Sequence, residues 1–363
     1  MSAEPPRLWI PGPTWVRPEI LAVCARPMIG HRGSAMKERI GSIDTRLRDL
    51  FGTKQHVLVL TASGSAAWEA AIRCSVASRW CVATNGAFSE RWAGIGAECG
   101  RETVRVEHAW GDGLSVDRIA EAIRRGGRFD AVAFVQNETS TGAWSDVPAI
   151  ARAAREAAPD ALLFVDCVSS LAGAPFEFDA WGLDVALASS QKCLALPPGI
   201  AVVALSDRFL ERAKSMAGRG YYLDLVRAAE DWANQQTPAT PAVSLFAALD
   251  EQLRAFERET LAARFERHRA MERETHAWAE ARGFESFVAP AHRSPTTSCR
   301  RAPRLDIAAF VKGLRARGHE ISDGYGKLKG QTFRIGHMGD HSLAELRSLL
   351  GSADDLLDSM RRR

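Results

Sequence analysis

The 363-residue sequence lacks the features that mark membrane, secreted or nucleic-acid-binding proteins. It has no apolar run near the ~18 residues that a membrane span needs. Its net charge is only +3, from 47 basic and 44 acidic residues, which leaves no excess charge for nucleic acid or an anionic membrane. The opening stretch MSAEPPRLWIPGPT has neither the basic nor the apolar segment of a signal peptide. We therefore expect a cytoplasmic protein, with neither nucleic acid nor a membrane as a partner.

Paired cysteines are also missing. The seven cysteines are scattered and odd in number, and none stands in the CxxC spacing that is typical of zinc sites. The sequence therefore predicts neither a disulfide framework nor a metal site, and a reducing compartment is the simplest setting. The cysteines are Cys24, Cys74, Cys81, Cys99, Cys167, Cys193 and Cys299.

The sequence does contain a regular alternation of short apolar runs and amphipathic stretches between residues 19 and 205. The short runs are rich in β-branched residues and leucine, which is typical of buried strands. Strands that alternate with helices predict an α/β fold with a mainly parallel sheet flanked by helices. Seven runs are expected to be strands: 56–60, 81–84, 102–107, 130–136, 162–168, 184–189 and 200–205.

The pattern changes after about residue 240. Residues 242–283 form one long helical pattern with room for a single break, and shorter helix and strand signals follow it. We predict three parts: a Pro-rich N-terminal arm over residues 1–16, a large domain over 17–254 and a small C-terminal α+β domain over 255–363.

Ligands of open α/β sheets bind beyond the carboxyl ends of the strands, and the first polar group there is Ser63-Gly64-Ser65. This tripeptide follows a strand and opens a helix. Free backbone N–H groups and the helix dipole favour an anion at such a junction, and glycine lets a phosphate approach closely. The alternative is an ordinary helix cap, so the motif alone does not establish a phosphate site.

Asp166 and Lys192 follow two later strands. A carboxylate at the end of the apolar strand that closes with Asp166 is costly to bury unless it meets a cation or a donor, although it could simply cap the next turn. Lys192 lies among small and apolar residues, with no acid within seven positions on either side. A desolvated lysine becomes a usable nucleophile, whereas most lysines reach the surface.

Taken together, the three features match what pyridoxal 5'-phosphate requires. The helix junction at 63–65 would hold its phosphate, Asp166 would keep its ring nitrogen protonated, and Lys192 would form the Schiff base. The sequence therefore predicts a pyridoxal-phosphate enzyme.

The same residues lie in segments that resemble the class V aminotransferases, which are fold-type I pyridoxal-phosphate enzymes, on the alanine–glyoxylate/serine–pyruvate branch. The resemblance covers nearly the whole chain, and residues 164–206 are its most specific block. It implies a large domain with a mainly parallel seven-stranded sheet and a smaller C-terminal α+β domain. The other matching segments are PGPTWVRPEIL (11–21), MIGHRGSAM (28–36), SGSAAWEA (63–70), NGAFSERW (85–92), NETSTGAWSDV (137–147), TPATPAVSLFAAL (237–249) and YGKLKGQTFRIGHMGD (325–340).

The resemblance implies a role for each matching site residue. Lys192 and Asp166 would be catalytic, and Arg334 would clamp the substrate's carboxylate with a bidentate guanidinium. Phe88 stands where the family often has tryptophan stacked on the cofactor. The family forms homodimers with sites at the interface, so Thr240 would reach the phosphate of the neighbouring subunit. The cofactor-binding set is Ser63, Gly64, Ser65, Phe88, Thr139, Asp166, Gln191, Lys192 and Thr240.

The expected reaction is transfer of an amino group from a small amino acid, such as alanine or serine, to a 2-oxo acid such as glyoxylate or pyruvate, with ping-pong kinetics. The amino donor cannot be read from the sequence, and neither can the roles of His31, Arg32, Tyr325 and His337. The alternatives are a 2-aminoethylphosphonate or pyridoxamine transaminase, a cysteine desulfurase that would use Cys299, or a catalytically silent member acting as a subunit.

Overall fold

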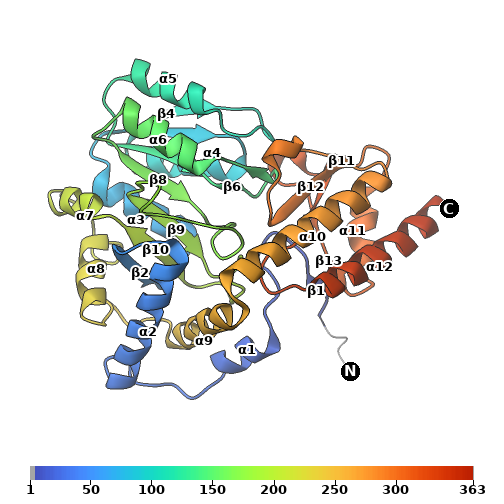
Figure 1. Cartoon of the computed structure of the whole chain (residues 1–363), viewed down its shortest axis with the longest axis horizontal. Coiled ribbons are helices and arrows are strands. Elements are labelled where there is room, and N and C mark those ends of the chain that lie inside the picture. Colours follow the sequence, from blue (N-terminus) through green and yellow to red (C-terminus); the bar gives the residue numbers. More distant parts are fainter. Residues whose placement is uncertain (1–4, 363) are drawn as a thin grey trace.

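A seven-stranded sheet forms the centre of the larger lobe in the computed structural model, which describes residues 5–362 (Figure 1). Only one strand, β10, runs antiparallel to its two neighbours, and the remaining neighbours pair in parallel. All seven predicted runs are strands of this sheet, so the predicted α/β fold is confirmed. In sheet order the strands are β2 (His56–Leu60), β10 (Ala201–Leu205), β9 (Val185–Ser189), β8 (Leu162–Asp166), β5 (Ala131–Val135), β3 (Arg79–Thr84) and β4 (Glu102–Glu107).

Helices pack against this sheet because the apolar face of each helix is buried against the apolar strands. The Ala-rich α3 packs on β9 and β10, α4 packs on β3 and β4, and α6 packs on β8. Polar caps begin several of them; in α5 the Ser115 hydroxyl accepts the Arg118 N–H at 3.3 Å. The helices of this lobe are α1 (Pro18–Cys24), α2 (Ser34–Phe51), α3 (Gly64–Ser75), α4 (Ala87–Glu98), α5 (Val116–Gly126), α6 (Val147–Ala157), α7 (Asp207–Lys214), α8 (Leu225–Ala233) and α9 (Val243–Glu259).

The smaller lobe, on the right of Figure 1, is built on an antiparallel sheet in the order β11-β12-β15-β14. Three longer helices accompany it. The strands are β11 (Glu285–Ser286), β12 (Thr297–Arg301), β15 (Thr332–Gly336) and β14 (Ser322–Asp323); the helices are α10 (Leu261–Ala281), α11 (Ile307–Arg315) and α12 (Leu343–Arg361). The short 3₁₀ helices are η1 (Pro290–His292) and η2 (Gly326–Leu328). Two small ribbons complete the fold, β1 (Arg7–Leu8) with β13 (His319–Glu320), and β6 (Asn137–Glu138) with β7 (Ala143–Trp144).

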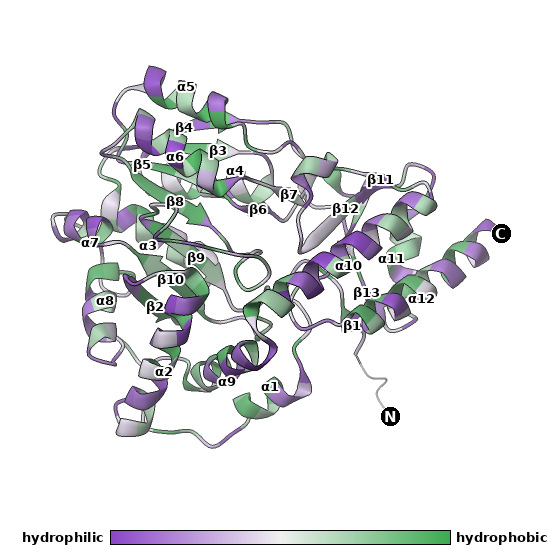
Figure 2. Ribbon diagram, in the orientation of Figure 1, coloured by the Kyte–Doolittle hydropathy of each residue, from purple (hydrophilic) through white to green (hydrophobic). Residues whose placement is uncertain are grey.

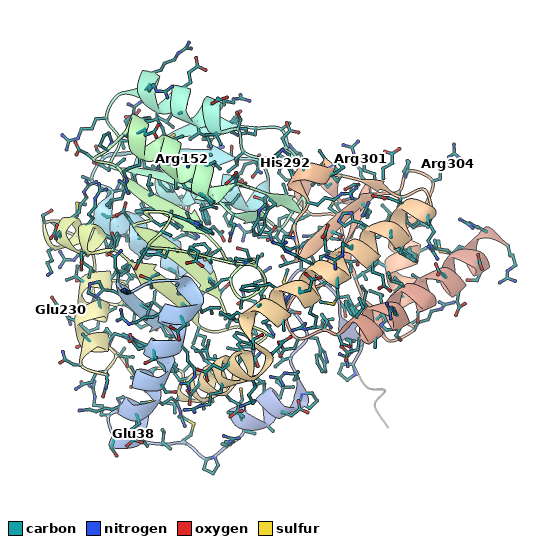
Figure 3. All side chains as sticks on the ribbon, in the orientation of Figure 1. Glu38, Arg152, Glu230, His292, Arg301 and Arg304 are labelled. Carbon is teal, nitrogen blue, oxygen red and sulfur yellow. The ribbon has the colours of Figure 1, made fainter. Side chains whose placement is uncertain are left out.

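Two hydrophobic cores follow the two sheets. The larger core is built between Ile20 and Phe256 together with Met338, and the smaller core takes Trp9 and residues from 271 to 357. Figure 2 shows the strands of the large sheet as mainly hydrophobic, whereas the outer turns of the helices are hydrophilic. Charged side chains such as Arg152 and Glu230 lie at the surface (Figure 3).

The long predicted helix is broken between the cores. Helix α9 ends at Glu259 and α10 begins at Leu261, and Thr260 between them has φ +65°. The N-terminal arm also divides between the lobes, since β1 pairs with the small lobe while Pro11 to Pro13 lie against the large one. Residues 1–4 of the predicted arm lie outside the described residues. The predicted domain boundary at residues 254 and 255 stays a prediction.

Within residues 5–362, no helix has the length and hydropathy to cross a membrane.

Candidate active site

A cavity of about 240 Å³ opens at the carboxyl ends of β2, β8 and β9, where an open α/β sheet binds its ligands. Because the ends of these strands meet at one edge of the sheet, residues far apart in the chain come together there. Seven of the predicted residues line the cavity: Ser63, Gly64, Ser65, Phe88, Asp166, Gln191 and Lys192.

The tripeptide Ser63-Gly64-Ser65 forms the N-terminus of α3. Ser63 is the N-cap, and its hydroxyl accepts the Ala66 N–H at 3.3 Å, so the ordinary capping role is present. Both serines are exposed toward the cavity, and the first N–H groups of the helix have no partner within it. A Cβ at Gly64 would lie 3.3 Å from Val168 Cγ2, so a side chain there would press on the cavity wall. This cradle has the geometry that suits a phosphate.

Asp166 is the last residue of β8 and is only 7% exposed. One carboxyl oxygen accepts the Val168 N–H at 2.6 Å, so the predicted turn-capping contact exists as well. Burial raises the pKa of Asp166 to about 8, helped by the negative charge of Glu138 and opposed by that hydrogen bond and by Lys192. The Asp166 carboxyl therefore has few partners within the protein and can accept a hydrogen bond from a ligand.

Lys192 follows β9 and is 9% exposed. Its ammonium group donates to the Pro11 carbonyl oxygen of the N-terminal arm. Burial and, second to it, the positive charge of Arg334 lower the pKa of Lys192 to about 8, while Asp166 opposes the shift. Gly12 has φ +106°, and a Cβ there would collide with the Lys192 side chain, so only glycine lets the arm pass this close.

An aromatic pair forms another wall of the site. The rings of Phe88 and Tyr325 stack with centroids 5.1 Å apart and an interplanar angle of 28°. The amine of Lys192 lies 5.9 Å from the Phe88 centroid. Two guanidinium groups flank Tyr325, because Arg91 Nη2 donates to its hydroxyl at 2.7 Å and Arg334 Cζ lies 5.4 Å from its ring centroid.

Arg334 reaches this site from the small lobe, on β15. Its neighbours Phe333 and Ile335 are buried in the smaller core, so the strand places the guanidinium on the opposite side. Arg334 is 7% exposed, and its Nη1 and Nε donate to the backbone carbonyls of Thr139 at 3.3 Å and Asp323 at 3.2 Å. No carboxylate forms an ion pair with Arg334 among the residues that the structure describes, which leaves its charge for a ligand.

Not every predicted residue meets at the cavity. The Thr139 side chain is buried and bonds Ser169 Oγ at 2.6 Å. Thr240 is exposed and lines a separate hollow with Tyr222, so within one subunit it does not reach Lys192. Of the residues left open, Arg32 donates to Gln236 at 3.2 Å outside the cavity. The imidazole of His337 is fully buried and bonds Ser298 at 2.9 Å, which is a packing role.

Sequence reasoning did not assign several residues that the fold brings to the site. Arg91 lies one turn after Phe88 in α4, a spacing that puts both on one helix face, and this was the available signal. Glu138 is fully buried, and its carboxylate accepts the Ser89 N–H at 2.9 Å and the Ser140 N–H at 3.0 Å. It thereby fixes the start of α4, from which Phe88 projects. Nothing in the local sequence indicated that contact.

Comparisons with known proteins identify the family of this chain. Residues 21–327 match the family described as aminotransferase class-V. The chain is 36% identical over 339 residues to the soluble hydrogenase small subunit of Synechococcus sp., covering 92% of this chain and 88% of that protein. It is 32% identical over 361 residues to the L-aspartate–glyoxylate aminotransferase of Paracoccus denitrificans, covering 97% and 90%. It superposes on the alanine–glyoxylate aminotransferase of Nostoc sp. with a TM-score of 0.92 and 28% identity, covering 98% and 96%. The predicted family is therefore confirmed, and the chain belongs to the class V aminotransferases, whose fold is that of pyridoxal-phosphate enzymes.

Proposed function

We propose that this chain binds pyridoxal 5'-phosphate at Lys192 and transfers an amino group from a small amino acid, such as alanine or serine, to a 2-oxo acid such as glyoxylate or pyruvate. The observation that carries the proposal is the meeting of two groups at one cavity. Lys192 and Asp166 are both buried there, and both have a pKa shifted to about 8 by burial. Relatives named for glyoxylate support the choice of acceptor.

The residues of the cavity fit this cofactor. The start of α3 offers free N–H groups and the hydroxyls of Ser63 and Ser65 to a phosphate, and Gly64 keeps the approach open. Asp166 would pair with the ring nitrogen, and Phe88 would cover one face of the ring. Gln191 lines the same cavity beside Lys192. When bound, the cofactor supplies an electron sink for negative charge that develops at the donor's Cα.

The chain's own residues then supply positioning and proton transfer. Arg334 would bind the donor's carboxylate through two charge-assisted hydrogen bonds, each contributing about 1.5–3 kcal/mol. Because its pKa lies near 8, a useful share of Lys192 is neutral at ordinary pH, and its amine can remove and return the proton at Cα. The low exposure of Lys192 and Asp166 limits the access of water to these two groups.

Two alternatives fit the structure less well. Cysteine desulfurases need a reactive cysteine on a mobile loop, whereas Cys299 is buried in β12 and its pKa is raised to about 11 by burial. Enzymes that use free pyridoxamine need no phosphate cradle, yet the start of α3 forms one. The name of the Synechococcus relative describes a subunit, and a subunit role without catalysis is separated by the experiment below.

We further propose that the protein is a cytoplasmic homodimer in which Thr240 of one subunit completes the phosphate site of the other. The exposure of Thr240, away from the cavity of its own subunit, supports a contact made across an interface. Size measurement in solution, with and without cofactor, tests the dimer.

The decisive test of the proposed function is Lys192→Ala, with the exposed Lys214→Ala in α7 as the matched control. Purified wild type with added cofactor should show a near-visible absorbance band, lose it on addition of a donor, and form a keto acid. Lys192→Ala should lose both the band and turnover, and Lys214→Ala should keep both. Turnover by Lys192→Ala would overturn the proposal, and a wild-type protein without a band would favour the subunit role.

A further inference from the structure

The cavity wall carries a guanidinium that the proposed reaction does not use. Arg91 is exposed, lines the cavity, and lies one turn after Phe88 on the same face of α4. Its Nη2 donates to the Tyr325 hydroxyl at 2.7 Å, and its Cζ lies 5.0 Å from the Phe88 centroid. Among residues 5–362 it has no ion pair with a carboxylate.

The charged side chains around the cavity would suit a substrate with more than one anionic group. Two cationic side chains line the cavity, Lys192 and Arg91, and Arg334 lies beside it, with its Cζ 5.4 Å from the Tyr325 ring centroid; Asp166 is the only acid among the described lining residues. The nearby carboxylate of Glu138 is already held by N–H and hydroxyl donors. A guanidinium that faces a partly enclosed space without an acid partner favours an anionic ligand.

The arrangement also puts Arg91 within reach of a donor held at the other two cations. Lys192 and Arg91 lie 5.9 Å and 5.0 Å from the Phe88 ring, and Arg334 lies 5.4 Å from the Tyr325 ring that stacks on it. A donor whose carboxylate sits on Arg334 and whose amine lies near Lys192 has one further substituent on Cα. Arg91 and the Tyr325 hydroxyl are the remaining polar groups that the side chain of the donor could contact.

We propose that Arg91, oriented by Tyr325, is a specificity-determining residue that selects a short anionic side chain, so that the preferred small donor is a dicarboxylic amino acid of the aspartate type. This rests on the proposed function and on the carboxylate role of Arg334. On binding, the planar Arg91 guanidinium would donate to the side-chain carboxylate of the amino donor instead of to the Tyr325 hydroxyl, because a carboxylate is the stronger acceptor.

The test compares donors in the cofactor-saturated full-length protein with glyoxylate as acceptor. Wild type should show a kcat/KM for aspartate at least tenfold above that for alanine. Arg91→Gln should lower the value for aspartate about 30-fold or more and that for alanine at most threefold, and Arg91→Lys should fall between. The matched control is Arg73→Gln on α3, an exposed arginine paired with Glu69 outside the cavity, which should leave both values unchanged.

A binding measurement separates this subsite from general damage. Succinate carries both carboxylates of aspartate without the amine, and its Kd, measured by calorimetry, should rise tenfold or more in Arg91→Gln, whereas that of propionate should change less. If Arg91 instead binds the cofactor's phosphate, the variant will weaken cofactor binding and lower both donors together, which overturns the inference. Equal use of alanine and aspartate by wild type also overturns it while the proposed function stands. No turnover with any donor overturns both.

Discussion

Two buried carboxylates of this molecule, Asp166 and Asp340, have pKa values that are shifted in opposite directions. The side chains of Asp166 and Asp340 are both shielded, with about 7% of Asp166 and of the Asp340 side chain exposed. Burial raises the pKa of Asp166 to about 8. Burial alone would raise that of Asp340 as well, but Arg264 and Arg17 lower it to about 2. The difference therefore lies in the partners that each carboxylate finds.

Asp340 is fully partnered within the protein. It accepts from Arg17 Nε at 2.6 Å, from Arg264 Nη1 at 2.8 Å and from Gln252 Nε2 at 2.7 Å. Arg264 also donates to the Cys193 carbonyl at 2.7 Å, next to Lys192, so this network joins the loop that carries Lys192 to the segment that follows β15. A satisfied buried pair of this kind supports the architecture, whereas the poorly partnered Asp166 fits the proposed role of a ligand-binding group.

The largest effect is expected from removing the charge of the partnered carboxylate. Asp340→Asn leaves the buried Arg264 without its main counter-charge, which typically costs about 3–5 kcal/mol of unfolding free energy. Urea unfolding of the cofactor-free protein measures this loss of unfolding free energy. The surface pair Arg347–Glu274 provides the control, since Arg347→Gln should cost about 0–1 kcal/mol. A loss for Asp340→Asn no larger than this control would contradict the contrast.

Asp166→Asn should lower turnover and leave stability unchanged, which is the reverse of the effect expected for Asp340→Asn. We expect turnover to fall about 10²- to 10³-fold, because a preorganised electrostatic contact to the cofactor is lost. The cofactor-free protein should be no less stable than wild type near pH 8, since the variant removes a poorly compensated buried charge. Steady-state kinetics and urea unfolding give the two values. An Asp166→Asn variant that is destabilised but keeps its turnover would reverse the two roles.

The two carboxylates should also differ in the sign of their pH dependence. Asp340 has a lowered pKa, so its stabilisation is present above its usual value of 3.8 and is lost as the pH falls toward 2, about 2 kcal/mol in all. Asp166 has a raised pKa, so its contribution falls as the pH rises from 3.8 to 8. Unfolding free energies of wild type minus each Asn variant, measured across pH, should therefore slope in opposite directions. Slopes of the same sign would contradict the predicted difference between Asp166 and Asp340.

Glu138 gives the smallest expected effect and an intermediate case, since it is fully buried but is held by neutral donors instead of cations. Glu138→Gln keeps the shape and loses part of the bonding, at a cost of about 1 kcal/mol. Because Glu138 holds the start of α4, the cofactor's Kd should rise about five- to tenfold, measured by fluorescence titration. Ser115→Ala, which removes the N-cap of α5, should cost similar stability and leave cofactor binding unchanged. Equal Kd values in the two variants would contradict this role.

Much of the site was predictable because short sequence patterns report strand ends and helix starts. The apolar runs before Asp166 and Lys192 and the small residues at 63–65 placed these groups at the carboxyl edge of the sheet. In β15, the alternation of Phe333, Arg334 and Ile335 does not by itself show whether Arg334 faces solvent or a site, because both faces give the same pattern. The break at Thr260 was not located either, because both neighbouring segments have helical sequences.

By itself, the sequence determined the order of strands and helices, the family, and the residues that could anchor the cofactor, because these depend on local periodicity and on motifs of adjacent residues. The tertiary structure alone decided which distant groups face them. Lys192 meets the Pro11 carbonyl across 181 positions, and Arg91 meets Tyr325 across 234. Such contacts depend on how two lobes pack, and their effect on charge follows from burial. The shift of Asp166 and Lys192 toward a pKa of about 8 is therefore a property of the folded chain and not of its local sequence.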